Sequence, residues 1–285
     1  MGCLLPEATR LIDGVRFAEA PRWVGDRLWF SDVHAYQLKT VTLDGAVEVV
    51  AEVPGRPSGL GALPDGRMLM ATALDRRLLA VGLDGSQEAV ADLNGLATGL
   101  LNDMVVDGQG RAYVGDTGFN MAAGDPPGPG RLIIWEAGSE PRVAAEDVVF
   151  PNGCVVSADG AALIICETMA QRISRFTIAP DGSLGERSIF AELDTPPDGL
   201  CLDAEGAVWA GLPHASAFVR IAPDGQIVER IPSAFPFAVA CALGGPDRRA
   251  LFMCSADTDL PRLAKGETTG RIDTVEVEIG GAGWP

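Results

Sequence analysis

Basic residues are scarce in this chain of 285 residues. Lysine and arginine together number 22, against 39 aspartates and glutamates, and the formal net charge at pH 7 is −17. A chain of this charge is repelled by nucleic-acid phosphates and by anionic lipid surfaces. The composition therefore argues against nucleic-acid and membrane partners. The acid surplus can attract cations, or it can simply keep the protein in solution.

The chain also lacks the marks of secretion and membrane insertion. No apolar run approaches the length of a membrane span, and the N-terminal MGCLLPEATR lacks the charged and then apolar pattern of a signal peptide. The six cysteines form no C-x-x-C pair and no metal-finger spacing, and most lie inside apolar runs. They are typical of reduced, buried thiols, so we predict a cytoplasmic protein.

Common catalytic signatures are missing as well. The sequence has no G-x-S-x-G nucleophile elbow and no glycine-rich phosphate loop between a strand and a helix. Helical periodicity is almost absent. Short alternating apolar runs recur instead, separated by turns that use many of the 35 glycines and 20 prolines. This pattern predicts an all-β protein.

One stretch is repeated along the chain. PDGLCLDAEGAVWAGLP (197–213) has an acid before two strand-like runs and a tight turn, and the stretches 101–116 and 151–167 repeat this order. Six such units follow one another at intervals of about 40–50 residues, as in the blades of a β-propeller. We predict a six-bladed β-propeller with four antiparallel strands per blade, in one domain over 1–285. The N-terminal run 8–13 would supply the last outer strand and close the ring.

Polar residues stand where the first strands of four units begin. In a propeller these strands line the central channel, so their starts meet at one mouth. The residues are Glu19, Asn102 with Asp103, Asn152 and Asp198. Carboxylates and carboxamides gathered in this way suit a hard cation such as Ca²⁺, with Mg²⁺ or Mn²⁺ as alternatives. Each residue taken singly could instead close a side-chain-to-backbone turn.

The ends of the second strands return to the same rim. They bring Asp116 and the two histidines of the chain, His34 and His214, to the region of the mouth. Either histidine can act as a base or contact a substrate, or it can be an ordinary loop residue. The run from Phe119 to Gly130 is rich in glycine and proline, and it predicts a lid or substrate-binding loop, or else a surface excursion.

Five motifs in order carry a family resemblance. They are EAPRWVGDRLWFSD, LNDMVVDGQGRAYVGD, FPNGCVVSADGAALIICET, PDGLCLDAEGAVWAG and ALGGPDRRALFMCS. Together they resemble the senescence-marker-protein, gluconolactonase and luciferin-regenerating enzyme family, which includes the regucalcins, over essentially the whole chain. The resemblance implies a six-bladed propeller with one divalent metal, usually Ca²⁺, in the channel mouth. It also implies hydrolysis of lactones or, in some relatives, of phosphotriesters.

The family's site residues can be matched to this chain position by position. The resemblance implies that Glu19, Asn152 and Asp198 bind the metal and that Asp198 is the general base. Asn102 stands where the family has a fourth ligand or a substrate-contacting asparagine. Asp103, beside it, would hold a water molecule or an asparagine side chain in place.

Leu100 departs from the family pattern. Sugar-lactone hydrolases of the family carry an arginine at this position, two residues before the asparagine that matches Asn102. An acidic residue of their next rim loop has no clear counterpart in GDTGFNMAAG (115–124). We therefore expect a substrate less polar than an aldonolactone. The expected substrate contacts are Leu100, Asn102, Asp103, Asp116, Phe119, His34 and His214.

The resulting prediction is a metal-dependent hydrolase of a lactone or an ester. The metal, Ca²⁺ first and Mg²⁺, Mn²⁺ or Zn²⁺ otherwise, polarises the carbonyl, Asp198 assists the attack of water and Asn102 orients the substrate. Two alternatives fit the same site: a phosphotriesterase, and a propeller that isomerises or cyclises a biosynthetic intermediate or only binds a ligand. The expected partner is a small molecule, and the expected state is a monomer or a homodimer.

Overall fold

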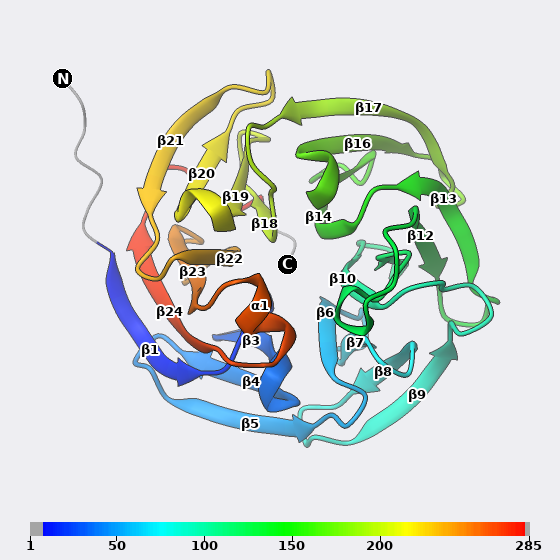
Figure 1. Ribbon diagram of the computed structural model, residues 1–285, viewed down its shortest axis with the longest axis horizontal. Helices are drawn as coiled ribbons and strands as arrows, with labels where there is room; N and C mark the ends of the chain where they lie inside the picture. Colours follow the sequence, from blue (N-terminus) through cyan, green and yellow to red (C-terminus); the bar gives the residue numbers. More distant parts are fainter. Residues whose placement is uncertain (1–7, 283–285) are drawn as a thin grey trace.

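The computed structural model describes residues 8–282, and almost all of its regular structure is β-strand. The strands form six sheets of four antiparallel strands each, which stand around a central axis like the blades of a propeller (Figure 1). The predicted fold class is confirmed. None of the helices in this part of the chain is long and apolar enough to cross a membrane.

Five blades use four consecutive strands each. Blade 1 consists of β2 (Ala18–Val24), β3 (Arg27–Asp32), β4 (Gln37–Thr42) and β5 (Val47–Glu52). Blade 2 consists of β6 (Pro57–Ala62), β7 (Met68–Thr72), β8 (Arg77–Val81) and β9 (Gln87–Asp92). Blade 3 consists of β10 (Leu101–Val106), β11 (Ala112–Asp116), β12 (Gly130–Trp135) and β13 (Arg142–Val148). Blade 4 consists of β14 (Pro151–Val156), β15 (Ala162–Glu167), β16 (Arg172–Ile178) and β17 (Leu184–Glu192). Blade 5 consists of β18 (Leu200–Leu202), β19 (Val208–Leu212), β20 (Ala217–Ile221) and β21 (Ile227–Pro232).

Blade 6 is assembled from both ends of the chain. Its inner strands are β22 (Phe237–Gly244), β23 (Ala250–Asp257) and β24 (Thr269–Glu276), and its outer strand is β1 (Thr9–Val15). β1 pairs with β24 from Thr9 opposite Thr274 to Val15 opposite Gly270. The predicted closure by the N-terminal run is confirmed, and it leaves blade 6 with the same four strands as the others.

Short helices follow the second strand in five blades. They are η1 (Val33–Ala35), η2 (Met121–Ala123), η3 (Thr168–Ala170), η4 (Pro213–Ala215) and α1 (Leu260–Ala264). Because second strands end at the mouth, these turns form its rim, and Figure 1 shows α1 and η2 close to the axis. The sequence pattern did not predict α1, whose first turn is capped by the Asp259 carboxylate accepting from the N–H of Arg262.

Hydrophobic contacts bind each blade to its neighbours. The buried apolar side chains of the described residues form six clusters, each made by the facing sides of two successive blades. Between blades 6 and 1 the Trp23 ring stacks on the Phe252 ring, with centroids 5.3 Å apart. Successive side chains of a strand point to opposite faces of the blade, and both faces pack against neighbouring blades. Both sets of side chains are therefore apolar.

The first strands are irregular at the channel mouth. In β2, β10 and β14 the register with the second strand shifts within the stretch that contains Glu19, Asn102 and Asn152 respectively. A β-bulge of this kind bends a strand and changes the direction of its side chains. The side chains of these polar residues therefore do not follow the regular alternation between the two faces of the blade.

Glycines let the first strands of blades 4 and 5 approach each other closely. A Cβ atom added to Gly153 would lie 2.5 Å from Cα of Gly199 and 2.5 Å from the backbone nitrogen of Leu200. Gly153 follows Asn152, and Gly199 follows Asp198. The close backbone approach therefore brings these two polar side chains together.

We predict that Gly153→Ala lowers the free energy of unfolding by about 1–3 kcal/mol, because the added methyl group meets backbone atoms that cannot yield cheaply. Gly108→Ala is the control, since nothing lies within 4 Å of its added Cβ. The control should change stability by no more than about 0.5 kcal/mol in the same denaturant titration. Equal stability of the two variants would contradict the requirement for glycine at the mouth.

Candidate active site

Two carboxylates and a carboxamide meet at the channel mouth. Glu19 lies in the first strand of blade 1, and Asn152 and Asp198 open blades 4 and 5, both more than nine-tenths buried. Nδ2 of Asn152 donates hydrogen bonds to Oδ1 of Asp198 at 2.5 Å and to Oγ1 of Thr168 at 3.2 Å. Thr168 donates in turn to the carbonyl oxygen of Pro197 at 2.9 Å. These contacts hold the amide of Asn152 in one orientation.

Burial and repulsion raise the pKa of both carboxyl groups. Loss of water is the largest cause for Glu19, and with the negative charges of Asp198 and Asp103 it raises the pKa of Glu19 well above the usual value. Burial, with a contribution from Asp103, raises the pKa of Asp198 to about 7, although the hydrogen bond from Asn152 opposes this shift. The two acids are therefore held together at a cost that a bound cation would offset.

Asp103 is the third carboxylate of the channel, and an arginine compensates it. The guanidinium of Arg22 donates to Oδ1 of Asp103 at 3.0 Å and to the carbonyl oxygen of Met104 at 2.7 Å, with both charged side chains buried. Burial still raises the pKa of Asp103 above its usual value. Asp103 is not among the residues that line the cavity described below. This position makes it a support inside the channel, and its contact with a substrate stays a prediction.

The donor set at the mouth fits a hard divalent cation. Within residues 8–282 no three His, Cys, Asp or Glu side chains come together as a metal cluster. The donors here are instead mixed, with carboxylates from Glu19 and Asp198 and the amide oxygen of Asn152, to which no described residue donates. Carboxylate and amide oxygens are the ligands that Ca²⁺ takes. The residues present therefore suit the divalent metal that the family resemblance implies.

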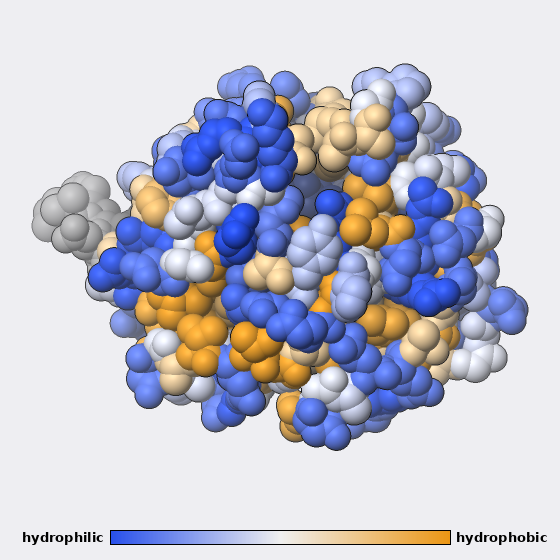
Figure 2. All heavy atoms as spheres, turned by 60° about the horizontal axis from the view of Figure 1, so that its bottom comes forward, coloured by the Kyte–Doolittle hydropathy of each residue, from blue (hydrophilic) through white to orange (hydrophobic). Residues whose placement is uncertain are grey.

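A cavity of about 180 Å³ reaches Glu19, whereas Asn152 and Asp198 are not among its lining residues. Glu19 and Asn102 line it, and Nδ2 of Asn102 donates to the carbonyl oxygen of Pro151 at 3.0 Å. In Figure 2 the surface is hollowed near the top, where hydrophobic and hydrophilic residues meet. The apolar part of the cavity lining includes Phe17, Leu100, Leu101, Phe119, Phe150 and Leu263.

Four of the predicted substrate contacts line this cavity: Leu100, Asn102, Phe119 and His34. The loop that begins at Phe119 also contributes Asn120 and Met121, so the predicted substrate-binding loop reaches the cavity. Its action as a lid stays a prediction.

The two histidines have different positions. His34 is half-buried in the cavity lining, and burial together with the positive charges of Arg56 and Arg16 lowers its pKa. The lowered pKa favours the neutral form of His34, whose imidazole can both donate and accept a hydrogen bond. His214 lies outside the lining, edge-on to the Phe237 ring at a centroid distance of 6.2 Å. The structure thus brings one predicted histidine contact to the cavity and not the other.

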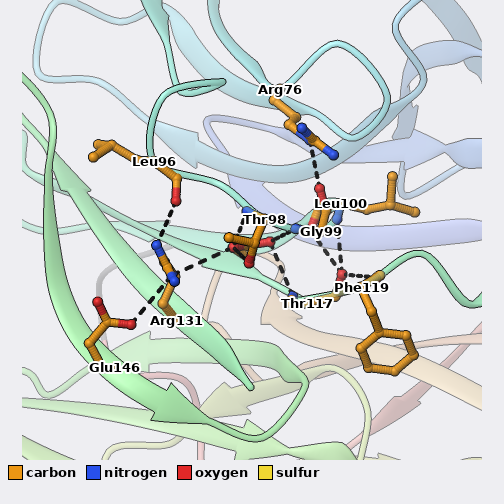
Figure 3. A network of polar contacts seen from close by, with 11 residues as sticks. Arg76, Leu96, Thr98, Gly99, Leu100, Thr117, Phe119, Arg131 and Glu146 are labelled. Carbon is orange, nitrogen blue, oxygen red and sulfur yellow. Dashed lines mark hydrogen bonds and ion pairs between the residues drawn. The ribbon is translucent and has the colours of Figure 1, made fainter. Parts of the chain in front are cut away.

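Asp116 braces a loop and does not line the cavity. Its carboxylate is fully buried. It accepts hydrogen bonds from the backbone N–H groups of Thr98, Gly99 and Gly118 at 2.8, 2.7 and 3.2 Å. Figure 3 shows this network, in which Thr98 and Gly99 lie at the centre.

The same network places two cavity residues. Oγ1 of Thr117 accepts from the N–H of Leu100 at 3.0 Å and donates to the carbonyl oxygen of Phe119 at 2.7 Å (Figure 3). Asp32 in blade 1 acts similarly, because it accepts from the backbone N–H groups of Arg16 and Phe17, both at 2.9 Å. Acids at the ends of second strands thus hold the incoming loops, while acids at the starts of first strands enter the channel.

The sequence pattern did not predict Arg56 as a residue of the site. It immediately precedes β6, in a blade whose mouth position is Pro57, and it lines the cavity together with Glu19 and Asn102. The available signal was a cation at the start of a first strand in a strongly acidic chain. α1 was also missed, and it contributes Leu260 and Leu263 to the cavity.

A six-bladed propeller with paired acids and asparagines at one channel mouth, beside a cavity, is the class of protein that these observations define. The chain belongs to the SMP-30/gluconolactonase/LRE-like family, whose model matches residues 17–257. This confirms the family resemblance of the sequence motifs.

Individual relatives are similar over most of their length. The chain is 27% identical over 278 residues to 6-deoxy-6-sulfogluconolactonase of Pseudomonas putida, covering 94% of this chain and 93% of that one. It is 27% identical to a pentonolactonase of Haloferax volcanii, with 88% and 86% covered. A crystal structure of a calcium-binding protein, regucalcin, from Agrobacterium tumefaciens superposes with a TM-score of 0.84 at 22% identity, covering 98% and 96% of the two chains.

We predict that Asp116→Asn lowers the free energy of unfolding by about 1–3 kcal/mol, because the new amide turns a donor toward backbone N–H donors. Asp224→Asn is the matched control, since Asp224 is exposed and accepts one N–H, from Gln226. Chemical denaturation of both variants measures the difference. A stability of Asp116→Asn equal to that of the control would contradict the bracing role.

Proposed function

We propose that this protein is a metal-dependent lactone hydrolase whose metal is Ca²⁺. The observation that carries the proposal is the set of Glu19, Asn152 and Asp198 beside a cavity large enough for a small molecule. The names of the relatives support the reaction, because two of them are lactonases of sugar-derived lactones. The calcium-binding regucalcin of the same fold supports the metal.

Glu19, Asp198 and the amide oxygen of Asn152 would hold the cation, with Asn102 as a further ligand or a substrate contact. When bound, a divalent cation supplies Lewis acidity toward the carbonyl oxygen of the lactone. Asn152 is presented for this role by its bonds to Asp198 and Thr168, which fix its amide plane. Side chains that bind a metal ion depend on hydrogen bonds to neighbouring groups for their orientation.

Asp198 takes the proton of the attacking water in this proposal. A carboxyl group whose pKa lies near 7 exchanges a proton readily at neutral pH. The water oxygen adds to the carbonyl carbon, the ring C–O bond breaks, and Asp198 returns its proton to the ring oxygen, which leaves as the hydroxyl group of a hydroxy acid. Phe17, Leu100 and Phe119 form an apolar wall that limits access of other water molecules. This wall also favours a substrate less polar than an aldonolactone.

Calcium should stabilise the folded protein. At a free Ca²⁺ concentration about 100 times the dissociation constant, ligand binding adds about 2.7 kcal/mol to the free energy of unfolding. Glu19→Gln and Asp198→Asn each remove a carboxylate ligand and should abolish most of the shift in a thermal denaturation series. A Ca²⁺ shift of wild-type size in both variants would place the cation elsewhere.

Lactone hydrolysis should depend on this site. Chelation should abolish turnover of a panel of five- and six-membered lactones, and Ca²⁺ should restore it. Assayed at a Ca²⁺ concentration raised until the metal is bound, Asp198→Asn should lower kcat by about 10²–10⁴-fold, the usual contribution of a positioned base. Full turnover by Asp198→Asn with metal still bound would show that Asp198 is not the base.

The same assay separates the alternatives. A phosphotriester assayed beside the lactones tests the phosphotriesterase alternative, and aryl esters test hydrolysis of open-chain esters. Calcium stabilisation without turnover of any of these substrates would contradict hydrolysis and favour the non-hydrolytic propeller.

A further inference from the structure

Arg56 is a cation without an anionic partner. Its backbone is tied into the rim, where its N–H donates to Val53 and its carbonyl oxygen accepts from the N–H of Ala73, and its φ of 63° is in the left-handed region. Its side chain takes part in none of the ion pairs of the described residues. Nε of Arg56 is buried and has no hydrogen-bond partner among them.

Several basic residues of the described part form no ion pair, and Arg56 differs from them in combining an unpartnered buried Nε with a place in the cavity lining. Other arginines of the mouth are satisfied: Arg22 pairs with Asp103, and Nε of Arg76 donates to the carbonyl oxygen of Gly99 at 2.7 Å. Arg56 is half-buried, and burying its Nε without an acceptor has a free-energy cost. Burial accordingly lowers the pKa of Arg56. The nearby acid Asp32 is engaged elsewhere, with Lys39 at 2.7 Å and with two backbone N–H groups.

The surroundings of Arg56 form an electropositive corner. The charges of Arg56 and Arg16 both lower the pKa of His34, which lines the same cavity. Arg16 directs its guanidinium to the carbonyl oxygen of Gly266 at 2.8 Å. A corner of this sign attracts an anion into a protein whose overall field repels one.

One cavity connects this corner to the acidic residues of the mouth. Glu19 and Asn102 line it together with Arg56, and apolar side chains such as Leu100 and Phe119 lie in the same lining. A small molecule whose carbonyl lies near Glu19 and Asn102 can therefore reach Arg56 with another group. Guanidinium groups bind carboxylates through two parallel hydrogen bonds.

We propose that Arg56 binds a carboxylate on the substrate, so that the protein acts on lactones that carry a carboxylate next to an otherwise apolar ring. This inference rests on the proposed lactone hydrolysis and specifies its substrate class. Leu100 stands where sugar-lactone hydrolases of the family are expected to carry an arginine. In this proposal Arg56 of blade 2 provides the positive charge of the cavity instead.

The test compares two substrates that differ in one charge, γ-carboxy-γ-butyrolactone and its carboxamide. Wild-type protein should prefer the carboxylate in kcat/KM. Arg56→Gln should lower kcat/KM for the carboxylate by about 10- to 100-fold, mainly through KM, as expected for loss of a charged hydrogen bond. The carboxamide should change less than about 3-fold, within the range of a surface substitution. Arg56→Lys should restore part of the loss.

Arg67→Gln is the charge control, because Arg67 is partly exposed in the same blade and pairs with Asp65 and Glu88. Arg67→Gln should leave kcat/KM unchanged for both the carboxylate and the carboxamide. Thermal denaturation adds a second reading: without ligand, Arg56→Gln should be as stable as wild type or more stable, since a strained charge is removed. A destabilised Arg56→Gln with equal losses on both substrates would make Arg56 a structural residue and overturn the proposal.

Binding of γ-carboxy-γ-butyrolactone, measured by calorimetry, separates this inference from the proposed function. If wild type turns over no lactone but binds the carboxylate at least about 10-fold more tightly than Arg56→Gln does, the carboxylate site stands and hydrolysis fails. If lactones are hydrolysed with no difference between the carboxylate and the carboxamide, hydrolysis stands and the carboxylate site fails.

Discussion

Closure of the ring by β1 is the constraint on which the site depends. The N-terminal strand pairs with β24 near the other end of the chain and completes blade 6. With the circle complete, each blade packs between two neighbours, and the six first strands are held around one axis. Glu19 and Asp198 lie far apart in the sequence, and the closed ring brings them close enough for the charge of Asp198 to raise the pKa of Glu19.

Charge is unevenly distributed inside the closed ring. Three carboxylates lie along the channel, Asp103 and Asp198 buried and Glu19 half-buried, and Arg22 pairs with Asp103. The remaining two repel each other and resist ionisation, which makes the mouth a place for a cation. On the side wall the sign is reversed, because Arg56 has no acid beside it. A small molecule with a carbonyl at one end and a negative charge at the other matches both ends of the cavity.

Acids of the same rim have different roles, and neighbouring backbone decides which. Asp198 follows a proline in the turn before its strand, and its carboxylate faces Asn152 at the axis. Asp116 ends a strand, and its carboxylate meets the free N–H groups of the loop before β10. Both residues were predicted as site residues, since each stands at a strand end on the same rim. The directions of their side chains depend on bulges and loop paths that no spacing rule contains.

The sequence alone determined the repeat, and with it the six blades, the ring closure and the positions of Glu19, Asn102, Asn152 and Asp198 at one mouth. This was predictable because strand periodicity and turn residues are local properties. Equivalent positions of the repeat then meet at the same mouth of the channel. The tertiary structure alone decided that Asp103 and Asp116 are supports, that His34 and not His214 reaches the cavity, and that Arg56 and α1 belong to it. These outcomes depend on which groups are left without partners after packing, which is a property of contacts between blades and not of any one segment.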